Sequence, residues 1–243
     1  MLVLIPFAAL LTHAFSGGPS GFFRAISQPE AVRALELTIF CAALTTLINA
    51  VMGTMIAIVL VRDQFAGKRI IDAIIDIPFA LPTIVAGVTL MTLLGPLSPI
   101  HLTLANAWTG IVVALLFVTL PFTVRTVQPV LETMSLDGER ASVTLGASPW
   151  RTFRSITLPS LVPAILTGAG LSFARAVGEF GSVVFISGNR PFHTEVASSY
   201  IFMLSQSQDF EGAASVSVFL LFVAIMILTV FAAFSRRWSA RLG

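Results

Sequence analysis

Apolar residues gather into long stretches along the chain, and short polar segments separate them. A helix needs roughly 20 residues to cross a hydrocarbon core of about 30 Å. Five stretches are long enough: residues 35–61, 70–94, 108–127, 161–186 and 213–234. The apolar stretch 1–15 is short for a span, but it lacks the basic flank and the cleavage site of a signal peptide, so we interpret it as a shortened first helix. The pattern predicts an all-α membrane protein: one transmembrane domain over residues 1–243, built as a bundle of about six transmembrane helices.

Prolines interrupt several of these stretches, at Pro78, Pro82, Pro121, Pro159 and Pro163. Proline removes a backbone donor, and in a membrane the freed carbonyl groups need neighbouring helices or a water-filled cavity. We therefore expect tightly packed helices around a central path.

Composition supports a lipid environment. Apolar residues make up 56% of the 243 positions and charged residues only 11%, well below the roughly 25% of soluble domains. The net charge of +2 includes a single lysine, Lys68, so no dense basic patch suggests nucleic acid. Cys41 stands alone in an apolar run and is expected to be buried. His13, His101 and His193 are scattered, so no metal site is predicted.

Basic residues are distributed unevenly between the polar segments. Alternate segments carry the larger share: Arg62, Lys68, Arg69, Arg140, Arg151, Arg154, Arg236, Arg237 and Arg241. The remaining segments carry only Arg24, Arg33 and Arg190. The positive-inside rule then predicts a multi-pass protein with both termini in the cytoplasm.

The longest segment of the basic side, residues 132–159, is called the coupling loop below. It predicts two short helices. Gly146 suits the end of the first, while Ser148 as N-cap and Pro149 at the first helical position begin the second. The second helix carries an apolar stripe that ends at Ile156. Such a stripe favours a partner protein, although an amphipathic helix can also lie on a membrane surface.

The same segment resembles the signature of permease subunits in importers of the ATP-binding-cassette (ABC) class, E-A-A-x3-G-x9-I-x-L-P. The match rests on the glycine, the nine-residue gap and the final I-x-L-P. Arg140 stands at the glutamate position, with Glu139 one place earlier and Ser142 at the second alanine. The resemblance implies that the loop docks on a separate ATPase subunit. The residues it assigns to this contact are Glu139, Arg140, Ala141, Gly146, Ala147, Ile156, Leu158 and Pro159.

Two further segments narrow the resemblance. DAIIDIPFALPTIVAG (72–87) and ARAVGEFGSVVFISGNRPFHTE (174–195) are similar to the T-type subunit of sulfate and thiosulfate permeases. Molybdate permeases share the R-x-x-G-E-F-G core, and the tail SGNRPFHTE favours sulfate. A molybdate or tungstate permease is the alternative within this class.

The resemblance also implies partners and a location. These are a dimer of ABC ATPase subunits holding ATP and Mg²⁺, a second permease (a W-type sister or a second copy) and an extracytoplasmic sulfate-binding protein, in the bacterial cytoplasmic (inner) membrane. The chain has no G-x-x-x-x-G-K-[ST] segment, so we expect no ATPase site and no cofactor of its own. A gradient-driven secondary transporter would need no ATPase, and an intramembrane enzyme would need a nucleophile or metal motif.

Charged residues inside the apolar stretches are the remaining candidates. Arg175 and Glu179 are four residues apart, which predicts one helix face shared with Ser182. Buried charges in a membrane cost roughly 2.5–3.5 kcal/mol each, so the pair either lines the anion path or locks helices together.

Polar residues of two other stretches have structural interpretations. Asp72 and Asp76 are expected to anchor a helix start, offset by Lys68 and Arg69. Asn49 predicts an interhelical hydrogen bond.

Overall fold

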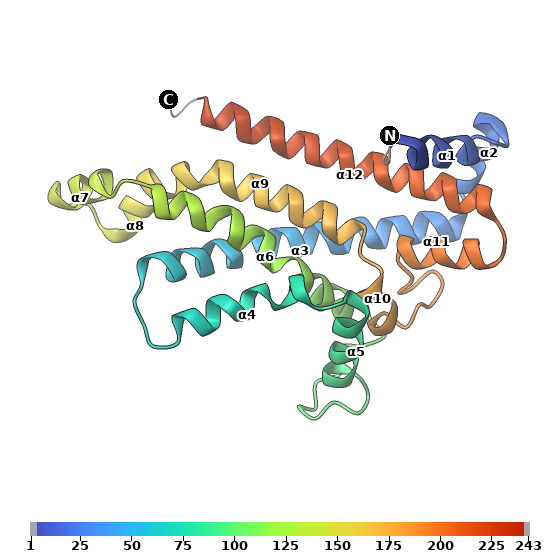
Figure 1. Cartoon of the computed structure of the whole chain (residues 1–243), viewed down its shortest axis with the longest axis horizontal. Helices are drawn as coiled ribbons and strands as arrows, with labels where there is room; N and C mark the ends of the chain where they lie inside the picture. Colours follow the sequence, from blue (N-terminus) through green and yellow to red (C-terminus); the bar gives the residue numbers. More distant parts are fainter. Residues whose placement is uncertain (1–3, 241–243) are drawn as a thin grey trace.

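The computed structural model describes residues 4–240, so Arg241 of the predicted basic side lies outside the described residues. The regular secondary structure of the described residues is all helical, with no strand (Figure 1). The α-helices are α1 (Leu4–Ala14), α2 (Gly18–Ile26), α3 (Pro29–Arg62), α4 (Lys68–Ala80), α5 (Thr83–Leu94), α6 (Trp108–Thr133), α7 (Asp137–Thr144), α8 (Pro149–Thr152), α9 (Leu158–Val177), α10 (Gly181–Ile186), α11 (Ala197–Gln206) and α12 (Phe210–Ser239). A π-helical turn, Phe153–Thr157, joins α8 to α9.

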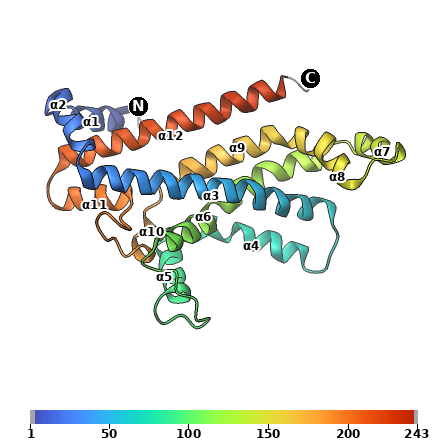
Figure 2. The same cartoon turned by 180° about the vertical axis from the view of Figure 1, so that it is seen from behind.

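Helix α6 lies at the centre of the bundle, with α3 and α9 against it and α12 on the outer side of α9 (Figures 1 and 2). Small residues bring these backbones together. A Cβ atom on Gly53 of α3 would lie 2.8 Å from the Cβ of Thr123 on α6, and one on Gly168 of α9 would lie 2.9 Å from the Cα of Thr123. Close backbone approach of this kind is how membrane helices gain packing contacts.

The predicted hydrogen bond of Asn49 is confirmed at the same interface. Its Nδ2 donates to Oγ1 of Thr119 on α6 over 2.8 Å, and both side chains are buried. Cys41 is buried as expected.

The number of spans is lower in the structure than the sequence pattern predicts. Among the described residues, α3, α6, the continuous helix Pro149–Val177 and α12 are long and apolar enough to cross a membrane. The pair α4 and α5 would make a fifth span. Helix α1 has 11 residues, packs beside α12 and remains shorter than a span.

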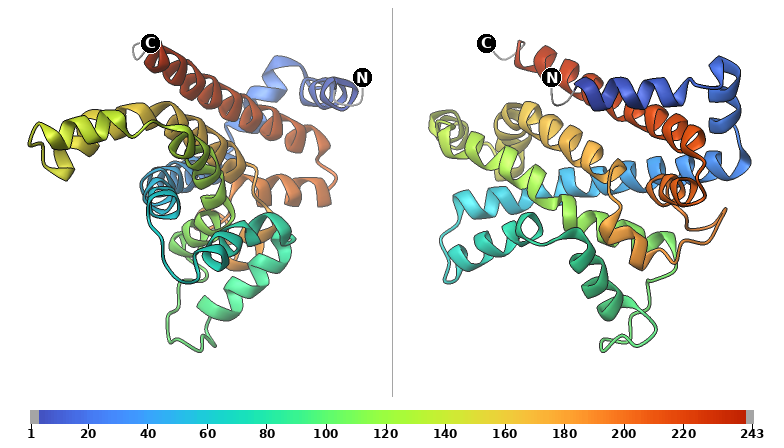
Figure 3. Two further views of the ribbon diagram at one scale, coloured as in Figure 1. Left: turned by 60° about the vertical axis from the view of Figure 1, so that its left-hand side comes forward. Right: turned by 45° about the vertical axis from the view of Figure 1, so that its right-hand side comes forward.

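The sequence pattern treats residues 70–94 as one span, but the structure divides this stretch into two helices. It bends by 113° between α4 and α5 (Figure 3). Pro82 offers no backbone donor, and Leu81 before it adopts extended angles, φ −81° and ψ 132°. A residue that precedes proline disfavours the helical region, so the helix ends there.

The stretch 161–186 is also broken, after Val177. Residues Gly178 to Phe180 separate α9 from the short α10. Helices α5 and α10 pack against each other so closely that a Cβ on Gly87 would lie 2.9 Å from the carbonyl oxygen of Gly181. The two broken spans therefore meet at their breaks.

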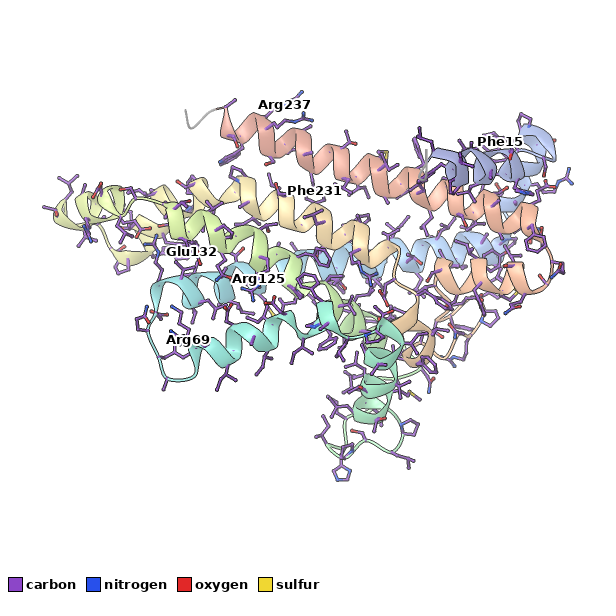
Figure 4. The ribbon with its side chains drawn as sticks, in the orientation of Figure 1. Phe15, Arg69, Arg125, Glu132, Phe231 and Arg237 are labelled. Atoms are coloured by element: carbon purple, nitrogen blue, oxygen red, sulfur yellow. The ribbon has the colours of Figure 1, made fainter. Side chains whose placement is uncertain are left out.

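The basic segments lie towards one end of the molecule, as the sequence pattern predicted. This arginine-rich end comprises the end of α3, the start of α4, helices α7 and α8, and the end of α12 (Figures 1 and 4). Helices α1, α2 and α11 lie towards the opposite end (Figure 2). This separation fits the positive-inside prediction, while the orientation of the termini stays a prediction.

Candidate functional site

The coupling loop folds as two helices joined by a tight turn at Gly146. Its φ of +80° lies in the left-handed region, and its N–H donates to the carbonyl of Val143. The N–H of Ala147 reaches back to the carbonyl of Ser142, so the end of α7 is closed by the bonds typical of a glycine-terminated helix. Ser148 then begins α8 as predicted, because its Oγ accepts from the N–H of Arg151 over 3.3 Å.

The second loop helix is continuous with the next span, whereas the sequence pattern placed the start of that span at residue 161. Residues Pro149–Val177 form one 29-residue helix. The π-helical turn makes this possible: the N–H of Leu158 bonds the carbonyl of Phe153, five residues back. Pro159 falls at the start of α9, and the Nε1 of Trp238 on α12 donates to its carbonyl over 2.9 Å. A force on the loop therefore acts directly on α9.

Glu139 joins the loop to α3 and also ties the two halves of the loop together. Its Oε1 accepts from Nη2 of Arg62, the last residue of α3, over 3.1 Å, and from Oγ1 of Thr157 over 2.8 Å. The Arg62 and Glu139 side chains are each 23% exposed. The neighbouring Arg140 is exposed instead. The glutamate next to the signature position thus holds the loop on α3 and bonds to the π-helical turn just before α9.

The outer face of the loop is apolar and open. Leu145 is 87% exposed and Trp150 66%, and the Trp150 ring stacks on Phe153 with centroids 5.5 Å apart. Beside this face lies a groove of about 720 Å³, whose lining includes Arg140. Of the other residues that the resemblance assigned to the contact, Ala141 and Gly146 are exposed and Ala147, Ile156, Leu158 and Pro159 are half-buried. Exposed apolar side chains with a cation at the edge fit a protein interface.

The intramembrane pair Arg175 and Glu179 does not share one continuous helix face, because α9 ends at Val177. Glu179 lies in the break, and its Oε1 accepts from the N–H of Ser182 over 2.8 Å and from its Oγ over 2.9 Å. Its other oxygen pairs with Nη1 of Arg175. The prediction of a shared face was wrong, although Glu179 contacts both Arg175 and Ser182.

The two members of this pair differ in exposure. The Glu179 side chain is 1% exposed, whereas one third of the Arg175 side chain is open. A buried carboxylate with a full set of donors is a rigid anchor, so it fixes the position of a cation that faces open space.

Sequence reasoning missed the role of Arg125, which forms a charged cluster with Asp72 and Asp76. Arg125 of α6 points towards α4 (Figure 4), where its Nε and Nη2 donate to the two carboxylate oxygens of Asp76 over 2.8 and 2.7 Å. Its Nη1 donates to Oδ1 of Asp72 over 2.7 Å and to Oε1 of Gln128 over 2.6 Å. The prediction that Lys68 and Arg69 offset the two aspartates was therefore wrong. An arginine inside a predicted span was the available signal.

Within residues 4–240, no group of three or more histidine, cysteine, aspartate or glutamate side chains is placed to hold a metal ion. The three histidines lie on α1, in the loop after α5 and in the loop before α11.

Comparison with known proteins agrees with this arrangement. Residues 49–242 match the family described as "Binding-protein-dependent transport system inner membrane component". The "Probable sulfate transport system permease protein cysT" of Nephroselmis olivacea is 41% identical over 233 residues, which cover 93% of this chain and 82% of that protein. The "Sulfate transport system permease protein CysT" of Escherichia coli K12 is 38% identical, covering 94% of this chain and 85% of that protein.

Solved structures show the same fold at lower identity. A chain of a bacterial ABC transporter involved in alginate import superimposes with a TM-score of 0.80 at 18% identity, covering 98% of this chain and 90% of that chain. A chain of the MetNI methionine ABC transporter gives 0.66 at 19% identity, covering 85% and 95%. Taken with the curated relatives, these matches confirm the resemblance: the chain belongs to the family of binding-protein-dependent transport system inner membrane components, among permeases of the CysT type.

Proposed function

We propose that this chain is the permease subunit of an ABC importer that carries sulfate or thiosulfate across the cytoplasmic membrane. The observation that carries the proposal is the coupling loop, whose exposed apolar face is continuous with a transmembrane helix. Relatives 37–43% identical over most of the chain are named as sulfate transport permeases, which supports the substrate.

In this proposal the energy comes from a partner. A dimer of ATPase subunits holds ATP and Mg²⁺ and closes on the nucleotide, while this chain contributes no catalytic site. Each ATPase subunit grips one coupling loop through the surface around Trp150 and the cation of Arg140. Because α8 continues into α9, closure tilts α9 as a unit, and the bond from Glu139 to Arg62 carries α3 with it.

The tilt of α9 reaches the two breaks where α5 and α10 meet. Arg175 lies one turn before the break, and the buried Glu179 holds its guanidinium in place. We propose that this cation lowers the electrostatic barrier to a divalent anion at the point where the path opens. Its partner carboxylate reduces the net charge, so the anion is attracted without being trapped.

The remaining partners follow the family: a second permease, either a W-type sister or a second copy, and an extracytoplasmic sulfate-binding protein. Both termini are proposed to face the cytoplasm. Affinity purification of the tagged chain from its native membranes tests this composition. Recovery of the ATPase and a second permease supports it, and purification of the chain alone contradicts it.

Substrate is tested by uptake of labelled sulfate in cells that lack their own sulfate uptake and express the complete system. We expect uptake that unlabelled thiosulfate inhibits and that molybdate and tungstate leave unchanged. Molybdate uptake without sulfate uptake would favour the alternative permease class, and uptake driven by a proton or sodium gradient would favour a secondary transporter.

The role of Arg175 is tested separately by Arg175→Gln. A complex that assembles normally but transports poorly supports the path role. Normal uptake by the assembled variant would leave the pair as a structural lock only.

A further inference from the structure

An apolar groove runs between α3 and the start of α4 at the arginine-rich end. It encloses about 300 Å³. Every side chain that lines it is apolar: Met52, Met55, Ile56, Val59, Leu60, Phe65 and Ile71. Met52, Met55 and Val59 are about half exposed, because no helix within residues 4–240 covers the face that carries them. A groove of this kind inside a bilayer is filled by hydrocarbon.

A second, polar pocket adjoins the groove at its outer end. It is lined by Gln64, Phe65, Gly67, Lys68, Arg69 and Ile70, and Phe65 belongs to both. Lys68 donates to the backbone carbonyl of Asp63 over 3.0 Å. Within the described residues it forms no salt bridge. Arg69 lies exposed at the turn between the helices (Figure 4). The outer end of the groove therefore carries two cationic side chains, Lys68 and Arg69.

At the turn itself, the acidic residues cancel only one of these two charges. Asp72 and Asp76 follow on the same helix, and both carboxylates bond to the one guanidinium of Arg125 on α6, so that cluster keeps one negative charge. Arg62, at the end of α3, is paired with Glu139. At the turn, Asp63 lies beside Lys68 and Arg69, so these three residues together carry a net charge of +1.

We propose that this composite site binds one anionic phospholipid of the cytoplasmic leaflet, with an acyl chain in the groove and the phosphate on Lys68 and Arg69. The occupant must be apolar along one part and anionic at one end, and a phospholipid has both features. A second permease could cover the apolar part, but an apolar helix would leave the net positive charge of the turn without a complement. Basic residues at the cytoplasmic surface attract anionic lipid in the same way.

The bound lipid would join α3 to α4 at a place where the chain itself provides little contact. Helix α4 contacts α6 through the bonds of Arg125 and through the Phe79–Phe122 ring pair, and Ile75 is its one buried residue. A lipid between α3 and α4 supports the first half of the broken span from the other side. Transport is therefore expected to depend on anionic lipid.

The proposal rests on the proposed function only for the placement of the chain in a bilayer. It is tested by native mass spectrometry of the purified complex, titrated with phosphatidylglycerol or phosphatidylcholine. We expect one phosphatidylglycerol retained per chain. Lys68→Gln with Arg69→Gln should weaken that retention about tenfold to thirtyfold. Val59→Trp, which fills the groove and keeps both cations, should also weaken it.

The matched control is Arg236→Gln with Arg237→Gln, which removes two cations of the same end on α12. This control should retain phosphatidylglycerol like the unaltered protein. Equal loss in the control, or equal retention of phosphatidylcholine, would overturn the site in favour of general surface attraction. A disulfide that links the Val59→Cys variant to a second permease would overturn it in favour of a protein interface. Lipid retention is measured without transport. The lipid result can therefore be interpreted even if the protein does not carry sulfate.

Discussion

The turn at Gly146 gives the sharpest test of how the coupling loop works. Its φ of +80° is available to glycine at little cost, whereas a residue with a Cβ is strained there. No atom lies within 4 Å of the place a Cβ would take, so a substitution meets no steric obstacle. Within this chain, the expected effect of a substitution therefore comes from the backbone conformation.

The size of the effect follows from the cost of placing a side chain in the left-handed region. An ordinary L-residue in the left-handed region costs roughly 1–2 kcal/mol, and asparagine costs less. Gly146→Val should therefore shift the loop away from its folded turn by about fivefold to thirtyfold. Gly146→Asn, a side chain of similar size, should shift it far less. The pair separates backbone strain from side-chain bulk.

The assay is the ratio of sulfate moved to ATP hydrolysed, in proteoliposomes that contain the whole complex. For Gly146→Val we expect hydrolysis to continue while the ratio falls, because the ATPase closes on a loop that no longer moves α9. Gly146→Asn should keep most of the ratio. Normal coupling in the valine variant would refute the reasoning, and equal loss in both variants would point to bulk at the docking surface.

Three other substitutions test the packing around the site. Asn49→Leu removes the buried bond to Thr119 and should lower the free energy of unfolding by roughly 0.6–2 kcal/mol, measured by denaturant titration in detergent; an unchanged value would contradict the bond. Arg125→Gln leaves two half-exposed carboxylates unpaired and should cost about 1–2 kcal/mol, and asparagine at both aspartates should restore most of it; no recovery would argue against an electrostatic cause. Burial, and then the carboxyl of Glu30, raise the pKa of Glu195 from its usual 4.5 to about 7. The folded protein therefore loses stability as pH rises through this interval, and Glu195→Gln should flatten the dependence of Tm on pH; parallel curves for the two proteins would contradict this.

Local signals in the sequence predicted the coupling loop well. Gly146, Ser148 and Pro149 act on the backbone within a few residues, so their effects do not depend on the rest of the fold. Asn49 was also predictable, because a polar side chain in an apolar helix needs a partner somewhere. The partner itself, Thr119, came only from the structure.

The predictions that were wrong concern contacts and bends that depend on distant parts of the chain. The carboxylate of Asp72 was assigned to its sequence neighbours, but its cation comes from Arg125, 53 residues later. The interruption at Pro82 was visible, yet the 113° bend depends on how α5 packs on α10. Likewise, Glu179 is four residues after Arg175, a helical spacing that held no information about the end of α9 at Val177.

The most direct test of the account is anion uptake by the reconstituted permease with and without its ATPase. With the ATPase and ATP present, we predict sulfate uptake; with either removed, uptake should stop even when a proton or sodium gradient is imposed. Uptake at full rate in the absence of the ATPase would contradict the claim that this chain is moved by a partner through its coupling loop.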